Sequence, residues 1–197
     1  GTRMWMTERE DSYQPPLALG TKMVGLVLGR VAATRHAGFA EGDLVRGFGQ
    51  WAENSVMQPE LAGLMKVDDS IDDIRQHFGV LGFNGWTALW GIRETAGVKA
   101  GDNVLVSAAA GSTGVLACQV AKILGANVYG LAGGPEKCRW LEEELGITRA
   151  IDYKKEDIAA ALAKVEGGIN AYFDNVGGPI LDAVLPNMAL YGRIALC

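Results

Sequence analysis

The residues with the clearest chemical potential form a run of small side chains after an apolar segment. Residues 103–108 are nearly all apolar, and they lead into the pattern Ala109-x-Gly111-x-x-Gly114-x-x-Ala117, from which a helix is predicted to continue. Small residues at this spacing allow a tight turn, a close approach of the backbone to a diphosphate, and close packing of helix on strand. The N–H groups at the helix start can then bind the anion. The turn therefore predicts a dinucleotide site, although Ala109 stands where the usual pattern has its first glycine.

The following strand indicates which dinucleotide would bind. A site for NAD expects Asp or Glu about 20 residues beyond the first glycine, where the acid holds the ribose hydroxyls. Counting from Gly111 reaches Leu131, which is followed by Ala132-Gly133-Gly134, and no acid is present there. The nearby charges are cations instead, at Lys137, Arg139, Lys154 and Lys155. This pattern suits a 2′-phosphate and predicts NADP(H), with Lys137 as a candidate ligand; the alternative is that these cations are ordinary surface charges.

Other kinds of site find little support. No Gly-Lys-Ser/Thr follows the glycines and no Gly-x-Ser-x-Gly is present, which disfavours a nucleoside triphosphatase and a serine hydrolase. His36 and His77 are far from any cysteine pair, and there is no Cys-x-x-Cys or His-Glu-x-x-His. We therefore expect no metal site, and we expect Cys118 and Cys138, which fall within predicted helices, to be structural.

Strands and helices alternate in residues 71–197, after a first part, residues 1–70, that reads as strands and loops. Two helices are expected first, one starting near residues 69–73 and one over 86–95 with Trp86 and Trp90 in the core. The remaining predicted strands are 103–108, 127–131, 149–152, 170–174 and 193–197, and the helices between them are 112–124, 135–145, 155–165 and 180–188. This order implies right-handed crossovers and an α/β fold, a Rossmann-type parallel sheet with helices on both faces.

Composition narrows the class of protein. The chain has 197 residues, of which 49% are hydrophobic and 21% charged, as in ordinary globular proteins. Its net charge of −5 argues against a nucleic-acid partner. The most apolar stretch, residues 114–134, is interrupted by polar residues and glycines, so no membrane span is expected. Three cysteines favour a reducing, cytoplasmic setting. Because the chain starts without Met and stops at Cys197 inside an apolar run, we expect a fragment.

Seven short sequence words extend this interpretation along nearly the whole chain. They are Ser12-Tyr13-x-Pro15-Pro16, Gly42-Asp43-Leu44-Val45, Leu81-Gly82-x-x-Gly85-x-Thr87-Ala88, Val106-x-Ala108-Ala109-Ala110-Gly111, Asp152-Tyr153-Lys154, Phe173-Asp174-Asn175-Val176-Gly177-Gly178 and Gly192-Arg193-Ile194-Ala195. In this order they resemble the zinc-independent medium-chain dehydrogenase/reductase superfamily. Within it they look most like NADP-dependent alkenal/enone double-bond reductases, which include prostaglandin (leukotriene) reductases and bacterial curcumin-type reductases.

The resemblance implies a role for each matching residue. Gly111, Ser112, Thr113 and Gly114 would hold the diphosphate, and Gly133 would lie on a turn that faces the cofactor. Lys137 and Tyr153 would meet the 2′-phosphate and the adenosine ribose. Thr87 would lie near the nicotinamide, and Asn175 near the ribose at that end. For Tyr153 and Asn175 the alternative is ordinary turn chemistry at strand ends.

The resemblance also implies what is missing and what the protein does. Residues 1–70 would be part of a β-rich, GroES-like catalytic domain, and residues 71–197 a Rossmann domain truncated at its C-terminus. A tyrosine thought to assist the reaction would lie outside the chain, so no catalytic residue is assigned. The expected activity is NADPH-dependent reduction of the C=C bond of α,β-unsaturated aldehydes or ketones, with hydride transfer to the β-carbon. The full-length protein is expected to be a homodimer acting on a small-molecule enal or enone. The alternatives are an NADPH:quinone oxidoreductase and a non-catalytic NADPH-binding relative.

Overall fold

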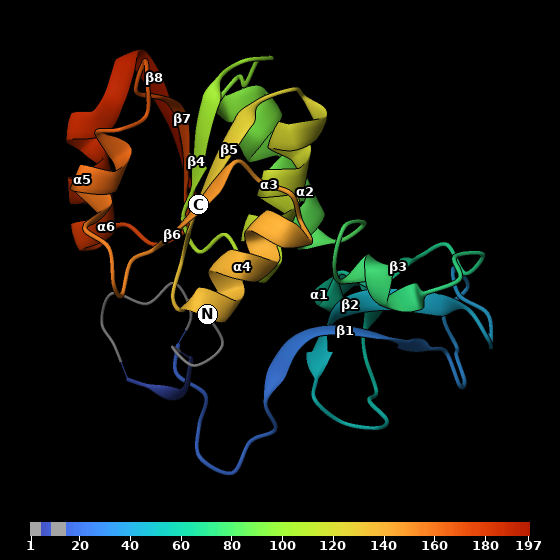
Figure 1. Cartoon of the computed structure of the whole chain (residues 1–197). Coiled ribbons are helices and arrows are strands. Elements are labelled where there is room, and N and C mark those ends of the chain that lie inside the picture. The colour runs from blue at the N-terminus through green and yellow to red at the C-terminus, as the bar shows by residue number, and fades with distance from the viewer. Residues whose placement is uncertain (1–4, 9–14) are drawn as a thin grey trace. The chain divides into compact units, whose positions relative to one another are not determined.

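The chain forms two compact units that divide between His77 and Phe78 (Figure 1). The computed structural model describes residues 5–8 and 15–197. The division falls after His77, whereas the sequence places it after residue 70. The short 3-10 turn η2 (Ile74–His77) belongs to the first unit because Nη1 of Arg46 donates to the carbonyl oxygen of His77 over 2.8 Å.

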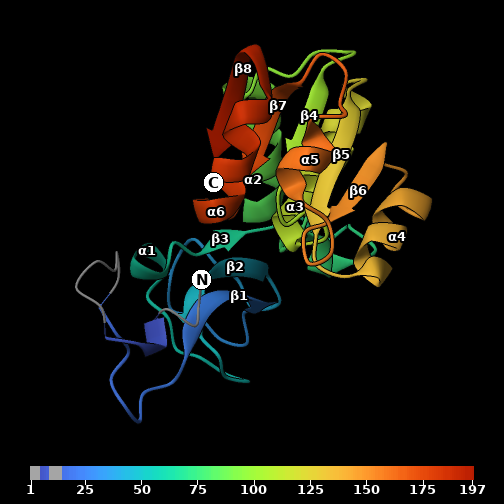
Figure 2. The same cartoon turned by 60° about the vertical axis from the view of Figure 1, so that its left-hand side comes forward.

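The second unit is built on a parallel sheet in the order β6-β5-β4-β7-β8, which confirms the predicted Rossmann-type fold (Figures 1 and 2). Its strands are β4 (Asn103–Val106), β5 (Asn127–Ala132), β6 (Arg149–Asp152), β7 (Ile169–Asp174) and β8 (Met188–Leu196). Each neighbouring pair is parallel. The chain order reverses between β4 and β7, and dinucleotides bind at the carboxyl ends of strands at such a reversal.

Helices cover both faces of this sheet. One face carries α2 (Phe83–Leu89), α3 (Ser112–Ile123) and α4 (Pro135–Glu143), and the other carries α5 (Ile158–Leu162) and α6 (Gly178–Val184) (Figure 2). Successive side chains of β4 pack on opposite faces of the sheet. Val104 and Val106 are buried with the first group of helices, and Leu105 is buried with the second. Because successive side chains of a strand point to opposite faces, β4 is apolar on both faces from Val104 to Val106.

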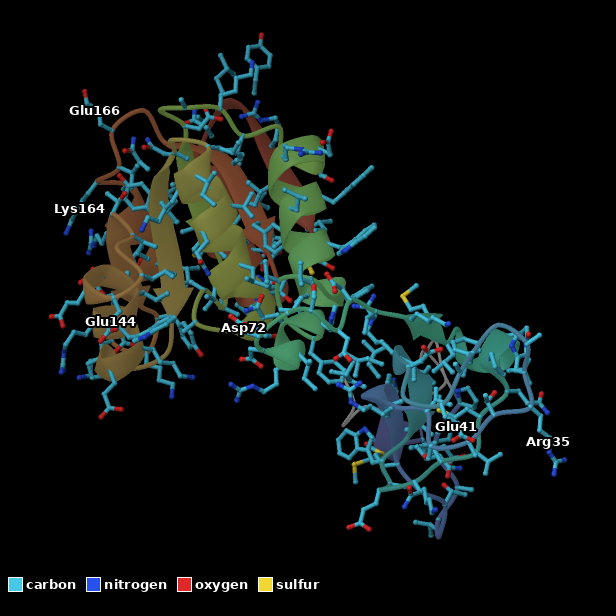
Figure 3. The ribbon with its side chains drawn as sticks, turned by 90° about the vertical axis from the view of Figure 1, so that its right-hand side faces the viewer. Arg35, Glu41, Asp72, Glu144, Lys164 and Glu166 are labelled. Carbon is cyan, nitrogen blue, oxygen red and sulfur yellow. The ribbon has the colours of Figure 1, made fainter. Side chains whose placement is uncertain are left out.

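Charged side chains lie on the outside of both units. Glu144, Lys164 and Glu166 are exposed on the second unit, and Arg35, Glu41 and Asp72 on the first (Figure 3). The charge of the chain is thus carried mainly by its solvated surface, while the sheet interior is apolar.

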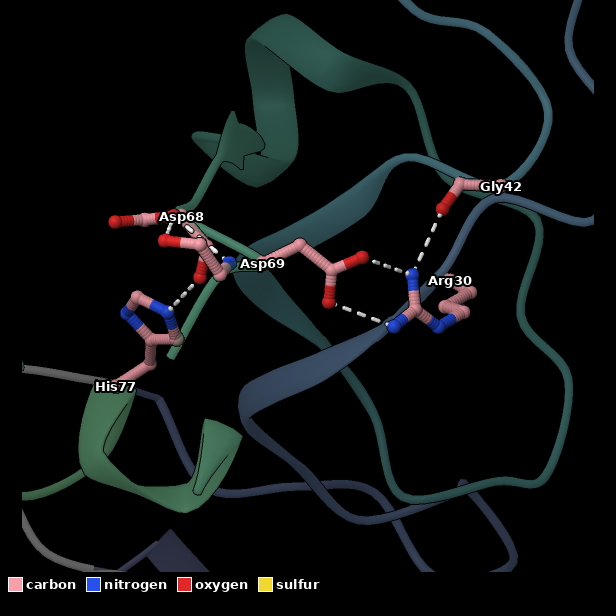
Figure 4. A network of polar contacts seen from close by, with 6 residues as sticks. Arg30, Gly42, Asp68, Asp69 and His77 are labelled. Atoms are coloured by element: carbon pink, nitrogen blue, oxygen red, sulfur yellow. Dashed lines mark hydrogen bonds and ion pairs between the residues drawn. The ribbon is translucent and has the colours of Figure 1, made fainter. Parts of the chain in front are cut away.

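The first unit is β-rich, as predicted. Strands β1 (Val24–Arg30), β2 (Leu44–Gln50) and β3 (Met65–Lys66) form an antiparallel sheet, and a short helix, α1 (Pro59–Ala62), precedes β3. At the end of β1, the guanidinium of Arg30 donates two hydrogen bonds of 2.7 Å to Asp69 and one of 3.0 Å to the carbonyl of Gly42 (Figure 4). Beside it, Nε2 of His77 lies 2.7 Å from the carbonyl oxygen of Asp68. Ser12 and Tyr13 of the sequence words lie outside the described residues.

Two predicted helices differ from the structure, because aspartate carboxylates bind backbone N–H groups near the expected helix starts. Near residues 69–73 only the turn η2 forms, since the carboxylate of Asp68 accepts from the N–H of Ser70 and that of Asp73 from the N–H of Arg75. The helix expected over 155–165 begins at Ile158, after Asp157 caps it through the N–H of Ala160 at 2.8 Å, and it ends at Leu162.

Other elements shift at their ends. The helix expected over 86–95 starts at Phe83 and continues beyond Leu89 as a π-helical turn, η3 (Trp90–Thr95). The last helix ends at Val184 and gives way to a 3-10 turn, η4 (Leu185–Asn187), which contains Pro186, and β8 then starts at Met188 rather than at residue 193.

The expectation that Trp86 and Trp90 are core residues was wrong. Their exposed fractions are 71% and 65%. The buried residues of this helix are instead Gly85, Ala88 and Ile92, and the side chains of Ala88 and Ile92 pack in the core with the sheet. At Gly91, an added Cβ would collide with the ring of Phe173, so the helix lies too close to β7 for larger residues.

Candidate dinucleotide site

The glycine-rich turn is fixed between β4 and β5 by backbone hydrogen bonds. Ala109 donates its N–H to the carbonyl of Leu131 over 3.0 Å, and Gly111 donates to the carbonyl of Ala108 over 2.8 Å. Ala108 has a φ of +47°, a left-handed conformation that alanine adopts at a cost. The chain thus reverses sharply within a few residues and delivers the start of α3 to the carboxyl edge of the sheet.

The turn packs tightly against the start of α3 and leaves backbone donors there that suit a diphosphate. An added Cβ at Gly114 would lie 2.9 Å from the carbonyl carbon of Ala108 and from Cα of Ala109, and closer still to the Ala108 carbonyl oxygen. Glycine is therefore required for α3 to pack this close to the turn. No side chain caps α3 at Gly111, so the N–H groups of its first turn, from Ser112 onward, are available to an anion.

A polar contact joins the start of α3 to α2. Oγ1 of Thr113 donates to Oδ1 of Asn84 over 3.1 Å. Oγ1 of Thr87 donates to the carbonyl of Phe83, one turn earlier in its own helix, over 2.8 Å. Toward a ligand the Thr87 hydroxyl therefore acts as an acceptor. Asn84 was missed from the sequence, because no motif marks a residue that contacts the turn from another helix.

The carboxyl ends of β5 and β6 form a second part of the site. Oδ1 of Asp152 accepts from the N–H of Gly134 over 2.9 Å and from the N–H of Lys154 over 3.1 Å. The Gly134 N–H, with the positive charges of nearby lysines, holds the pKa of Asp152 below its usual range despite burial. Tyr153 lies against Gly133, where an added Cβ would be 2.6 Å from its Oη. Gly133 and Tyr153, both predicted site residues, are thus brought together.

Lys137 and the glycine-rich turn line one open depression of about 310 Å³. Its lining residues are Ala110 from the turn and Glu136, Lys137 and Trp140 from α4. Trp140 and Glu136 were missed from the sequence, although Trp140 lies three residues after Lys137 and therefore shares its helix face. The acid that an NAD site expects at the end of β5 is absent in the structure as well, and the cation of Lys137 stands beside the turn.

The carboxyl ends of β4 and β7 form the third part. Asn175 donates its backbone N–H to Oγ of Ser107 over 2.8 Å and its Nδ2 to the carbonyl of Ser107 over 2.7 Å. Behind them, Asp174 is only 2% exposed and accepts from the hydroxyls of Ser107 and Tyr172. Asn175 is therefore held at the reversal point of the sheet, where folds of this kind bind dinucleotides.

Within the described ranges, no group of three or more His, Cys, Asp or Glu residues could hold a metal ion. His36 is exposed and its Nε2 lies 2.9 Å from Glu60. Cys118 and Cys138 lie within helices, as predicted, and both are buried; burial raises the pKa of the Cys118 thiol to about 12. In the same part of the chain, no helix is both long and apolar enough to cross a membrane.

Comparison with known proteins agrees with this architecture. Two families match the chain, one described as zinc-binding dehydrogenase over residues 112–197 and one as the N-terminal domain of oxidoreductase over residues 1–67. An NADP(+)-dependent 2-alkenal reductase of Nicotiana tabacum is 42% identical over 197 residues, which are 99% of this chain and 57% of the relative. An NADPH-dependent curcumin reductase of Escherichia coli (strain K12) is 38% identical over 189 residues, 95% of this chain and 54% of the relative.

A solved structure is also similar to this chain. The crystal structure of CurA in complex with NADPH from Vibrio vulnificus superposes with a TM-score of 0.84 and 34% identity, covering 98% of this chain and 57% of CurA. The chain belongs to the medium-chain dehydrogenase/reductase superfamily, of the zinc-independent type. Within it, the similar proteins named above are reductases dependent on NADP or NADPH, which confirms the family expected from the sequence. The chain spans little more than half the length of these relatives.

Proposed function

We propose that the complete protein is an NADPH-dependent reductase that saturates the carbon-carbon double bond of α,β-unsaturated aldehydes and ketones. Two relatives named as alkenal and curcumin reductases support the substrate class. The observation that carries the cofactor assignment is the depression shared by Ala110 and Lys137, because it sets a cation beside the diphosphate turn where the acid of an NAD site is missing.

In this proposal each part of the site binds one part of the cofactor. Gly111, Ser112, Thr113 and Gly114 bind the diphosphate, Gly133, Lys137 and Tyr153 face the 2′-phosphate and its ribose, and Thr87 and Asn175 line the nicotinamide end. NADPH, when bound, supplies the hydride that reaches the β-carbon. The chain's own residues bind and orient the cofactor. The group that protonates the α-carbon is not assigned to any residue of this chain.

Removing the Lys137 cation tests the cofactor assignment. A charge-assisted contact to phosphate contributes about 1.5–3 kcal/mol, so Lys137→Ala should weaken NADPH binding roughly tenfold to a hundredfold and change NADH binding little. Arg139→Ala is a matched control, because it removes the same charge from the same helix but does not line the depression. Fluorescence titration of the complete protein with both cofactors measures the effect. Equal losses for NADPH and NADH, or a preference of the unchanged protein for NADH, contradict the assignment.

Steady-state assays with three acceptors test the reaction. A linear enal, a cyclic enone and a quinone are offered with NADPH, and we expect turnover of the enal or the enone. Turnover of the quinone alone would favour an NADPH:quinone oxidoreductase of the same superfamily instead. Tight NADPH binding with no turnover of any acceptor would favour a non-catalytic relative.

The proposal includes a homodimer and a cytoplasmic location. Both come from the sequence and from the resemblance to the superfamily. Light scattering of the complete protein tests the first, and a monomer at micromolar concentration would contradict it. Microscopy of the tagged complete protein tests the second.

A further inference from the structure

The carboxyl ends of β4 and β7 hold a cluster of hydrogen-bonded polar side chains, formed by Ser107, Tyr172, Asp174 and Asn175. We propose that Ser107 and Asp174 are positioning residues for Asn175, and that they present its amide oxygen as a hydrogen-bond acceptor to the nicotinamide end of the cofactor. The inference rests on the proposed function, because it takes Asn175 to be a ligand of NADPH.

Asp174 is the central hydrogen-bond acceptor of the cluster. Its Oδ1 accepts from the hydroxyl of Tyr172 at 2.8 Å, from the N–H groups of Val176 and Gly177 at 2.9 Å each, and from Oγ of Ser107 at 3.1 Å. Burial alone would raise the pKa of Asp174, but these donors outweigh it and hold the pKa below its usual value. The carboxylate is therefore ionised at neutral pH and can only accept.

Ser107 links Asp174 to Asn175 through its hydroxyl group. A serine hydroxyl has one proton to donate and two lone pairs that accept. Because the Ser107 hydroxyl donates its hydrogen bond to the Asp174 carboxylate, its Oγ lone pairs can accept from the backbone N–H of Asn175 at 2.8 Å. Ser107 is fully buried, so its hydroxyl has no competing solvent.

The same serine orients the side chain. Nδ2 of Asn175 donates to the carbonyl of Ser107 at 2.7 Å, which only the NH2 end of the amide can do. The amide oxygen consequently lies at the other end of the group, on a side chain that remains partly exposed. An acceptor fixed in this way selects a donor on the ligand, such as a ribose hydroxyl or the NH2 of the nicotinamide carboxamide.

Tyr172 supplies a control within the cluster. Its hydroxyl donates to Asp174, but no described contact joins it to Asn175. If the cluster only stabilised the fold, removing the Tyr172 hydroxyl and removing the Ser107 hydroxyl would act alike. If Ser107 positions Asn175, loss of the Ser107 hydroxyl should weaken cofactor binding more than loss of the Tyr172 hydroxyl, because only the Ser107 hydroxyl contacts Asn175 directly.

The test is a double-mutant cycle on NADPH affinity in the complete protein. Ser107→Ala, Asn175→Ala and the double variant are titrated with NADPH, with Tyr172→Phe beside them, and thermal melting is recorded for each. Asn175→Ala and Ser107→Ala should each weaken NADPH binding about threefold to tenfold. The double variant should bind no more weakly than Asn175→Ala, because a residue that acts through Asn175 has nothing left to position. Tyr172→Phe should lower the melting temperature, but it should weaken NADPH binding less than Ser107→Ala does, because the Ser107 hydroxyl still contacts Asn175.

Two results would overturn the positioning role: additive losses in the double variant, or an affinity of Ser107→Ala equal to that of the unchanged protein. Ser107→Thr, which keeps the hydroxyl, should bind NADPH more tightly than Ser107→Ala, and failure of this rescue also counts against the role. The proposed function fails separately, if the unchanged protein neither binds NADPH nor reduces an enal or enone. If it does both and the cycle is additive, only the positioning role is lost.

Discussion

Substituting alanine for Gly114 is the sharpest perturbation of the diphosphate turn. An added Cβ would lie 2.9 Å from two backbone atoms of Ala108 and Ala109, whereas ordinary contact starts at 3.4 Å, so the turn must move by at least about half an ångström. A misplacement of 1 Å in a binding site costs on the order of 10²-fold in rate, so we expect at least a tenfold loss in kcat/KM for NADPH. Crowding of this kind also destabilises a fold by about 1–3 kcal/mol, more than the ~1 kcal/mol that alanine gains over glycine in a helix.

Two matched substitutions make the measurement decisive. At Gly111 the nearest atom to an added Cβ is the Ala108 carbonyl oxygen at 3.0 Å, so Gly111→Ala should lose less than Gly114→Ala. At Gly29, in β1, nothing lies within 4 Å, and Gly29→Ala should leave NADPH affinity unchanged. Fluorescence titration with NADPH and steady-state kinetics report the losses. If Gly114→Ala binds NADPH as tightly as the unchanged protein, the reasoning about close packing at the turn is refuted.

Two further predictions concern stability. Ala108→Gly should raise the free energy of unfolding by about 1 kcal/mol and the Tm by roughly 2–4 °C, because it relieves a left-handed alanine; a lower Tm in calorimetry would contradict this. The pKa of Asp174 is lower in the folded chain than in the unfolded chain, so the unfolded chain binds a proton at this carboxylate first as the pH falls. The ionised carboxylate therefore contributes its full stabilisation above about pH 4, near the ordinary pKa of 3.8. This stabilisation is lost as the pH falls through the lower pKa of the folded chain. Urea unfolding at several pH values should therefore show the difference between the unchanged protein and Asp174→Asn shrinking below pH 4, and a constant difference would refute it.

The sequence predicted the elements whose signals are local. The apolar run before the glycine-rich pattern identifies β4, and Pro135 and Gly146 bracket α4, which ends at Glu143. Residues 149–152 form β6 as expected. Such elements are set by their own side chains and by short-range turn chemistry, so a single chain suffices to find them.

What the sequence missed depends on distant partners. The spacing of Trp86 and Trp90 indicates one helix face but not which face meets the sheet, and here the sheet meets Ala88 and Ile92. The contact of Ser107 with Asn175 joins residues far apart in the chain, and it exists only because β4 and β7 are neighbours in the sheet. Trp140 lines the depression for the same kind of reason. The roles assigned to the site residues remain predictions.

The close contact of Gly133 with Tyr153 limits how the cofactor preference of this protein can change over evolutionary time. A site for NAD(H), which has a 2′-hydroxyl in place of the 2′-phosphate, expects an acid near the end of β5. At position 133, any side chain would begin 2.6 Å from Oη of Tyr153, while the nearest existing acid, Asp152, already accepts from the N–H groups of Gly134 and Lys154. An acid at position 133 is therefore accommodated only if the Tyr153 side chain moves away or is replaced by a smaller one. A change of cofactor preference at this position therefore involves residue 153 as well as residue 133.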